Sequence, residues 1–280
     1  MPKVSVIIPC YNQGMYLEEA IQSVLAQSFR HFEIIIVDDG STDEATRALL
    51  ENYSRPHCTV YRKQNEGLPV ARNFGILRSK GEYILPLDAD DKIGNGYLEE
   101  AAAVLDRYPD VKIVYCQARY FGARKGVVKT PPFKLDEMLI HNLVFATAFF
   151  RRNDFNKTRG YVAEMKTGWE DWDFWLSLLE EGGRVYQIPK TYFFYRARKH
   201  SMVESLSAAQ KRELRRRVFL NHQNLYQRHF DSLTHQYYEL MDSPDLKIGR
   251  MLLNPLRALS GKILNSSSRR SPLWWEWPKP

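Results

Sequence analysis

The chain has 280 residues, of which 44% are hydrophobic and 26% charged, a composition typical of a soluble globular protein. Three cysteines without paired spacing exclude a disulfide framework or a cysteine-based zinc site and indicate a reducing compartment. The net charge of +7 is uneven, because residues 203–280 hold 13 Lys/Arg and 7 Asp/Glu whereas residues 1–202 hold 27 and 26. This distribution argues against nucleic-acid binding by the main domain and indicates a basic attachment surface near the C-terminus.

The apolar run at the start of the chain, residues 4–9, is too short for a signal peptide. No stretch approaches the roughly 18 uninterrupted apolar residues of a membrane-spanning helix. We therefore expect a cytoplasmic protein.

Strands and helices alternate in the first part of the chain. Apolar, β-branched runs predict buried strands, and 3.6-residue periodicity predicts helices between them. The predicted strands cover residues 4–9, 32–37, 60–62 and 82–87, and helices carry Leu17 to Leu25, begin at Ser41 and cover 68–79. The spacing of Ser41 and Glu44 is that of a capping box. This alternation predicts a largely parallel sheet with helices on both faces.

The second part of the chain is less regular. The pattern predicts a helix over 97–108, strands over 111–116, 144–150, 185–188 and 192–195, and a helix from Trp169 through Leu179. Residues 117–142 and 153–168 read as irregular, and residues 196–201 as a basic loop. A long amphipathic helix is predicted over 208–230, followed by residues 246–270 with six Lys/Arg and no acid.

Acidic residues follow two of the predicted strands. Asp38 and Asp39 end one, and Asp88, Asp90 and Asp91 end another. Carboxyl ends of parallel strands share one edge of the sheet, where open α/β sheets place their ligands. Two carboxylates on the same side of an extended chain suit Mg²⁺ or Mn²⁺. The alternative is a solvated acidic turn that caps the next helix.

Five motifs in this order resemble family 2 glycosyltransferases with the GT-A fold. They are residues 4–12 (VSVIIPCYN), 36–43 (IVDDGSTD), 71–75 (ARNFG), 88–91 (DADD) and the later pair Glu170-Asp171. The resemblance covers about residues 3–200. It implies a GT-A type, Rossmann-like α/β/α sandwich with a mostly parallel central sheet and a C-terminal helical appendage.

The resemblance also implies a division of the chain. Residues 1–202 would form the catalytic domain, with the nucleotide-sugar half at about 1–116 and the acceptor half at about 117–202. Residues 203–265 would form a helical basic segment and residues 266–280 a flexible tail.

The implied reaction is an inverting, metal-dependent transfer of a hexosyl or N-acetylhexosaminyl group. The donor would be a nucleotide-diphosphate sugar, with uridine expected, and the acceptor a hydroxyl of a glycan or lipid-linked glycan in surface polysaccharide biosynthesis.

The resemblance assigns several residues to the donor nucleotide. Asp39 would be the main nucleotide contact, and Asp38 a second one or a turn residue. Pro9 and Tyr11 would supply backbone contacts and a ring face for the base. Arg72 would either form charge-assisted hydrogen bonds near the nucleotide or an ordinary salt bridge.

A divalent cation, Mn²⁺ or Mg²⁺, would neutralise the leaving diphosphate. Asp90 is the expected metal ligand, and Asp88 would bind the ribose or share the metal. His200 is aligned less closely with a family histidine that reaches the metal or the diphosphate. Arg198 would bind the diphosphate. The alternative is that the basic loop, residues 196–201, is simply exposed to solvent.

Inversion requires a general base that removes the proton of the acceptor hydroxyl. The resemblance points to Asp171, at a predicted helix start where the dipole would keep it ionised, with Glu170 as the second choice. Without the resemblance, both acids read as helix-start residues. Trp169, Trp172 and Trp175 could stack on sugars or belong to the core.

Two other functions fit parts of the sequence. A non-catalytic nucleotide-sugar or glycan-binding module would lack the base or the metal acids, and a nucleotidyltransferase of related fold would carry a Gly-rich loop after the first strand. Residues 246–280 could contact an anionic membrane surface on its cytoplasmic side, or pack on the enzyme.

Overall fold

The structure is a computed structural model that describes residues 1–128, 130–198 and 205–246. The chain forms two compact units, Met1–Gln227 and Arg228–Pro280. The second unit includes the helix α10 (Phe230–Asp242). The sequence suggested a boundary at residue 202, whereas the first unit also takes in the helices α8 (Ala208–Asn221) and most of α9 (Gln223–Arg228).

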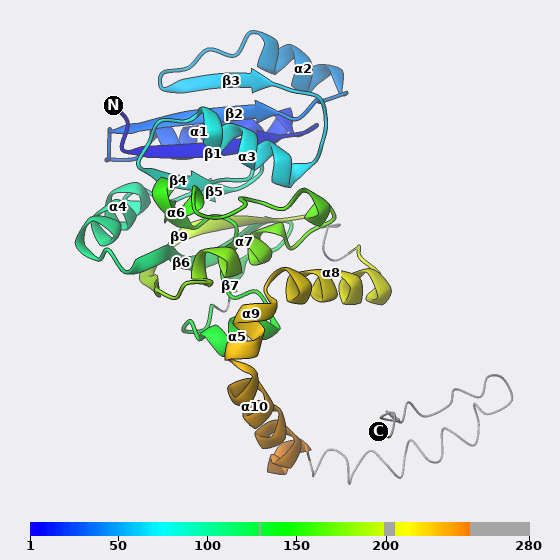
Figure 1. The fold of residues 1–280 in the computed structure, drawn as a ribbon. Coiled ribbons are helices and arrows are strands. Elements are labelled where there is room, and N and C mark those ends of the chain that lie inside the picture. The colour runs from blue at the N-terminus through cyan, green and yellow to red at the C-terminus, as the bar shows by residue number, and fades with distance from the viewer. Residues whose placement is uncertain (129, 199–204, 247–280) are drawn as a thin grey trace, which may run out of the picture. The chain divides into compact units, whose positions relative to one another are not determined.

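Within the described residues, a nine-stranded sheet forms the centre of the first unit (Figure 1). The strand order is β3-β2-β1-β4-β8-β6-β9-β5, with β7 paired to β6. The strands are β1 (Val4–Cys10), β2 (Phe32–Asp38), β3 (Cys58–Arg62), β4 (Tyr83–Pro86), β5 (Lys92–Ile93), β6 (Val111–Gly122), β7 (Gly126–Val128), β8 (Phe149–Arg151) and β9 (Arg184–Ala197).

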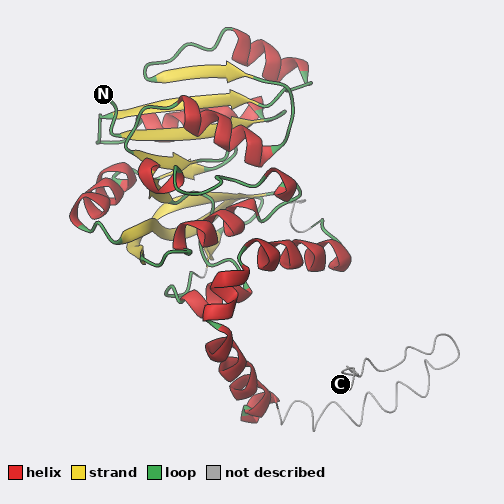
Figure 2. Cartoon of the chain, viewed as in Figure 1, coloured by secondary structure: helices red, strands yellow, loops and turns green. Residues whose placement is uncertain are grey.

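Helices connect the strands of the first unit (Figure 2). They are α1 (Gly14–Leu25), α2 (Glu44–Glu51), α3 (Leu68–Arg78), α4 (Tyr97–Arg107), α5 (Leu135–Ile140), α6 (Arg152–Phe155), the 3₁₀ turn η1 (Ala163–Met165) and α7 (Glu170–Leu179). The alternation of strand and helix predicted for the first part of the chain is confirmed.

Helices cover both faces of the sheet, so the predicted α/β/α sandwich is confirmed. On one face, Val6 and Ile8 of β1 share a buried cluster with Leu17 of α1 and with α4. On the other face, α3 lies so close that a Cβ atom at Gly75 would be 2.6 Å from Ile7 Cγ2. Because β1 is covered from both sides, it is apolar at almost every position rather than alternating.

The sheet is parallel in its first half and mixed in its second. β3, β2, β1 and β4 pair in parallel, as the strand–helix alternation predicts. β8 then runs antiparallel to both β4 and β6, and β5 runs antiparallel to β9. β6 and β9 are parallel. Short antiparallel strands need no crossover helix, so they leave no strand–helix alternation to read in the sequence.

Several predicted boundaries in the second half are wrong. β6 continues to Gly122, and β7 and α5 lie in the stretch predicted to be irregular. The predicted strand over 144–150 is reduced to β8, and the two predicted strands over 185–195 are one long strand, β9. In the second half of β6 only Ala118 is buried, so this half lacks the continuous apolar run of β1.

The long helix predicted over 208–230 is divided into three. α8 ends where the buried residue His222 leaves the helical conformation, with φ −127° and ψ 31°. α9 and α10 follow as separate helices. No helix among the described residues is both long and apolar enough to cross a membrane.

Candidate functional site

One cavity of about 680 Å³ lies where the strands β1, β2 and β4 end. Its walls gather most of the predicted site residues from segments far apart in the sequence. The predicted residues that line it are Pro9, Tyr11, Asp39, Arg72, Asp88, Asp90, Glu170, Asp171 and Arg198. The two exceptions are Asp38, which does not line the cavity, and His200, which lies outside the described residues.

Asp38 holds the loop after β2. It is buried, and its Oδ1 accepts a hydrogen bond from Ser41 N at 2.8 Å. Its Oδ2 lies 3.4 Å from Arg62 Nε. Of the two roles that the sequence left open for Asp38, the structure shows that of a turn residue.

The loops after β1 and β2 are joined through Asn12. Asn12 adopts the left-handed conformation, with φ 53°, and its Oδ1 accepts hydrogen bonds from Thr42 N and Asp43 N at 2.8 and 3.0 Å. Ser41 does not cap α2 as predicted. The cap is Asp43, whose side chain accepts from Thr46 N, whereas Ser41 Oγ accepts from Asn12 N.

Asp39 fixes the loop between β3 and α3 against the cavity. Its Oδ1 lies 2.8 Å from Lys63 Nζ, and its Oδ2 accepts a hydrogen bond from Gly67 N at 2.9 Å. Asp39 is 3% exposed, yet it lines the cavity. Its carboxylate is therefore oriented by the protein before any ligand binds.

Arg72 lies between two carboxylates in the wall of the cavity. Its Nη2 donates to Asp88 Oδ1 at 2.7 Å and its Nη1 to Glu170 Oε1 at 2.5 Å. Burial disfavours the guanidinium charge, but Asp88 and Glu170 more than offset this, so the pKa of Arg72 is raised. Of the two roles left open for Arg72, the structure shows the salt bridge, which positions an acid of the DADD motif beside an acid of α7.

The remaining acids of the DADD motif are packed closely. Asp90 forms an ion pair with Arg198, and Asp91 Oδ1 accepts a hydrogen bond from Arg196 N at 2.7 Å. Burial and the neighbouring Asp88 raise the pKa of Asp90, although Arg198 opposes the shift. Burial, Asp90 and Asp88 raise the pKa of Asp91 well above its ordinary value. Burial and the mutual repulsion of these closely packed carboxylates both disfavour their charged forms, so the cluster is short of compensating positive charge.

This charge shortage fits a divalent cation at the end of β4. Within the described residues, no group of three or more His, Cys, Asp or Glu side chains is arranged to hold a metal ion. Mg²⁺-type sites commonly use one or two carboxylates and take further oxygen ligands from substrate phosphates. Asp90 and Asp88 are the residues that would supply the carboxylates of such a set.

Asp171 lies in the first turn of α7 and lines the same cavity. Its Oδ2 accepts a hydrogen bond from Asn142 Nδ2 at 3.0 Å, and its Oδ1 accepts one from Trp172 N at 2.8 Å. Burial and the adjacent Glu170 raise the pKa of Asp171 to about 7, although Arg72 lowers it. The helix dipole that we expected to keep Asp171 ionised is therefore opposed by burial.

The three tryptophans near Asp171 divide into two kinds. Trp172 and Trp175 are core residues, 2% and 0% exposed, and their ring nitrogens donate to Met138 O and Val144 O. Trp169 lines the cavity.

Sequence reasoning missed Asn142 and Lys166, which also line the cavity. Lys166 lies five positions before Asp171 on the loop that enters α7. Asn142 follows His141 in a largely apolar stretch from Met138 to Phe150, a weak signal for a site residue.

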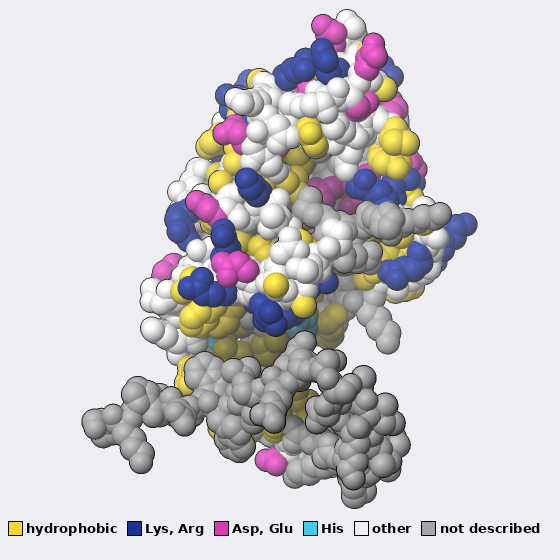
Figure 3. Space-filling model, turned by 90° about the vertical axis from the view of Figure 1, so that its right-hand side faces the viewer, with side chains coloured by type: hydrophobic (Ala, Val, Ile, Leu, Met, Phe, Trp, Pro, Cys, Tyr) yellow, Lys and Arg dark blue, Asp and Glu magenta, His cyan; other side chains and the backbone are white. Residues whose placement is uncertain are grey.

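Charged side chains lie interspersed over the described part of the face drawn in Figure 3, without one continuous basic area.

An open α/β sheet with carboxylates from two strand ends and one helix around a cavity is the architecture of a GT-A glycosyltransferase. The family described as Glycosyl transferase family 2 matches residues 5–172, and the chain belongs to this family. The resemblance seen in the sequence is thus confirmed.

Two relatives and one solved structure illustrate the match. An uncharacterized glycosyltransferase of Rickettsia typhi is 33% identical over 189 residues, or 64% of this chain and 59% of the relative. TuaG of Bacillus subtilis, provisionally described as a teichuronic acid biosynthesis glycosyltransferase, is 48% identical over 103 residues, or 35% of this chain and 40% of the relative. In both cases the match spans less than two thirds of the relative.

The solved structure is that of residues 1–349 of TarS from S. aureus in complex with UDP-GlcNAc. It superposes with a TM-score of 0.64 at 22% identity and covers 78% of this chain and 66% of TarS 1–349. This likeness establishes the GT-A fold.

Proposed function

We propose that the protein transfers a hexosyl or N-acetylhexosaminyl group, with inversion, from a UDP-sugar to an acceptor hydroxyl in glycan or surface polysaccharide biosynthesis. The observation that carries this proposal is the shared cavity, in which Asp171 of α7 and the acids after β4 meet around Arg72. Family membership supports sugar transfer, and the complexes of TarS with UDP and with UDP-GlcNAc support a uridine donor.

The nucleotide would lie at the ends of β1 and β2. Tyr11 is 44% exposed at the rim and offers a ring face to the base, and Pro9 lines the cavity beside it. Asp39 is held by Lys63 and Gly67 N, so its carboxylate is already oriented toward hydroxyl or N–H donors of the nucleotide.

Mn²⁺ or Mg²⁺ would bind at Asp90 and Asp88, with Arg198 beside the diphosphate and His200 as a further candidate ligand. The cation would neutralise the charge that develops on the leaving diphosphate. Asp90→Ala should abolish the Mn²⁺-dependent part of UDP binding in calorimetric titration. The exposed acid Asp110, which pairs with Arg184, provides the control Asp110→Ala. Equal Mn²⁺ dependence in the Asp90 and Asp110 variants would refute the metal assignment.

Asp171 would act as the general base. The acceptor oxygen forms a bond to the anomeric carbon, the bond to the diphosphate breaks, and the acceptor proton passes to the Asp171 carboxylate. A pKa near 7 suits this task, because about half of the group is ionised at pH 7 and the carboxylate is still a competent base. Glu170, the second candidate, is occupied by Arg72 and is less suited to receive a proton.

The proposal is tested by screening nucleotide sugars for thermal stabilisation with and without Mn²⁺, followed by measurement of UDP release. A donor at 100 times its Kd should stabilise the fold by about 2.7 kcal/mol. Stabilisation without transfer to any acceptor or water would favour a non-catalytic module. The family match already disfavours a nucleotidyltransferase.

The acceptor would be a glycan or lipid-linked glycan, reached at the cytoplasmic face of a membrane through residues 246–280. All of this segment except Leu246 lies outside the described residues, so its role rests on composition: six Lys/Arg and no acid over residues 246–270. Deletion of residues 246–280 should release the protein from anionic vesicles in a sedimentation assay. Unchanged sedimentation would exclude this contact.

A further inference from the structure

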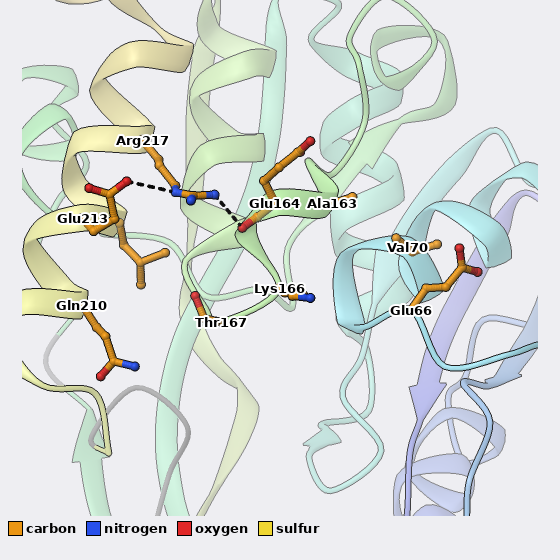
Figure 4. Close-up of a pocket in the computed structure, with 10 residues that line it drawn as sticks. Glu66, Val70, Ala163, Glu164, Lys166, Thr167, Gln210, Glu213 and Arg217 are labelled. Atoms are coloured by element: carbon orange, nitrogen blue, oxygen red, sulfur yellow. Dashed lines mark hydrogen bonds and ion pairs between the residues drawn. The ribbon is translucent and has the colours of Figure 1, made fainter.

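A second cavity of about 520 Å³ opens beside the catalytic cavity (Figure 4). It is a groove whose walls come from the start of α3, the loop that enters α7, and α8. Its lining residues are Glu66, Val70, Ala163, Glu164, Lys166, Thr167, Gln210, Glu213, Leu214 and Arg217. We refer to these residues as the α8 groove.

The α8 groove adjoins the catalytic cavity at Lys166. Lys166 lines both, and its side-chain stem lies against Gly67, where an added Cβ would be 3.2 Å from Lys166 Cβ. The loop that carries Lys166 and Thr167 leads directly into Glu170 and Asp171. A chain whose end reaches Asp171 could therefore extend into the groove.

The charges of the α8 groove balance rather than select an ion. Arg217 is already engaged, because its Nε lies 3.3 Å from Glu213 Oε1 and its Nη1 3.3 Å from Glu164 O. Figure 4 shows both contacts. Within the described part of the chain, no ion pair involves the Lys166 ammonium or the Glu164 carboxylate, and Figure 4 shows these two side chains pointing apart. Glu66 pairs with Lys63, and Glu213 pairs with Arg216 and Arg217. Among the ten lining residues, three acids stand against two basic side chains, a balance that does not favour a polyanion.

The uncharged lining of the groove combines hydrogen-bonding groups with an apolar floor. The Thr167 hydroxyl and the Gln210 amide nitrogen make no hydrogen bond with the described residues. Val70, Ala163 and Leu214 supply apolar surface. Sugars present both hydroxyl groups and C–H faces, so this lining suits an uncharged oligosaccharide.

We propose that the α8 groove binds the acceptor glycan, as an uncharged oligosaccharide, at the sugar units behind the one that receives the new residue. This inference rests on the proposed transferase function and assigns its acceptor class. The lining residues from α8 lie beyond the family match, which ends at residue 172, whereas the other six lie within it.

The test measures binding of gluco-, galacto-, manno- and N-acetylglucosamine oligosaccharides of increasing length to the UDP-bound full-length protein, by titration and by hydrogen exchange. Galacturonate oligomers serve as the anionic comparison. In at least one neutral series, the Kd should fall about tenfold from disaccharide to tetrasaccharide, with protection of residues 163–167 and 210–217. Binding of the galacturonates alone, or no length-dependent protection in any neutral series, would overturn the proposal.

Substitutions in the groove test whether the oligosaccharide binds there. Ala163→Trp should fill the groove and abolish the increase in affinity with oligosaccharide length. Thr167→Val, which removes one hydroxyl, should reduce this increase even if Ala163→Trp fails to fold. Ala209→Trp, on α8 but outside the groove, is the matched control and should leave the increase unchanged. An increase that survives both groove substitutions would contradict the assignment.

UDP release from a nucleotide sugar in water is measured on the wild-type protein in parallel. Its absence for every donor would count against the transferase function itself. Release without length-dependent oligosaccharide binding would count against the α8 groove alone.

Discussion

Arg72 Nη1 lies 2.5 Å from Glu170 Oε1, which joins α3 to the first turn of α7 across 98 residues of sequence. The same guanidinium reaches Asp88, so one buried cation fixes the acids of the donor side relative to the helix that carries Asp171. The residue that the sequence offered as a nucleotide contact thus sets the geometry of the whole site.

Substitution of Arg72 should destabilise the protein strongly. Arg72→Ala would leave Glu170, which is 6% exposed, as an unpaired buried carboxylate, and should lower the free energy of unfolding by about 3–5 kcal/mol in urea denaturation. Arg72→Lys should lose less, because a lysine retains the charge but not the two-armed geometry. The exposed Arg62→Ala is the control, and an equal loss there would contradict this account.

The rate of sugar transfer should fall below neutral pH. Asp171 must be ionised to accept a proton, and burial and Glu170 raise its pKa to about 7. The acidic limb of the kcat/KM profile should therefore have its midpoint near pH 7. The charge of Arg72 lowers the pKa of Asp171. Because lysine retains that charge, Arg72→Lys should leave the midpoint of the acidic limb nearly unchanged. A limb near pH 4 would show that the environment of Asp171 differs from the one described.

His222 should anchor α8 and α9 to α7. It is 3% exposed, with Nε2 3.2 Å from Asp173 Oδ1 and Nδ1 3.3 Å from Glu180 Oε2. Asn221 Nδ2 also donates to Asp173 Oδ1, at 2.8 Å. His222→Phe would leave the fully buried Asp173 short of a partner, so the free energy of unfolding should drop by about 2–4 kcal/mol.

The control for His222 is His235→Phe, since the side chain of His235 is 74% exposed in its pair with Glu239. This change should alter the free energy of unfolding by no more than about 0.5 kcal/mol. A His222 variant as stable as the His235 variant would show that the buried cluster does not hold the helices.

The sequence predicted the strands that carry the site, because continuous apolar runs ending in acids mark buried parallel strands. It placed Asp39, Asp88, Asp90 and Asp171 on motifs that the structure brings to one cavity. Periodicity and spacing place the strand-end acids Asp39, Asp88 and Asp90, whereas the assignment of Asp171 rests on the resemblance to family 2 glycosyltransferases.

The roles of Asp38 and Arg72 could not be decided from the sequence. Asp38 is removed from the cavity by a hydrogen bond to Ser41 N, and Arg72 is engaged by a partner on α7. Lys166 and Gln210 belong to no sequence motif. The α8 groove that they line forms only when α8 packs beside the loop before α7. Such contacts depend on tertiary packing, which one sequence does not encode in any local pattern.

The most direct test of the central claim compares Asp171→Asn with Glu170→Gln in donor binding and in UDP release. Asp171→Asn should reduce turnover by about 10²–10⁴-fold, because it removes the general base, while the Kd for UDP stays within about twofold of the wild-type value. Glu170→Gln should retain more activity than Asp171→Asn. Near-normal turnover in Asp171→Asn, with Glu170→Gln inactive, would contradict the assignment of Asp171 as the base.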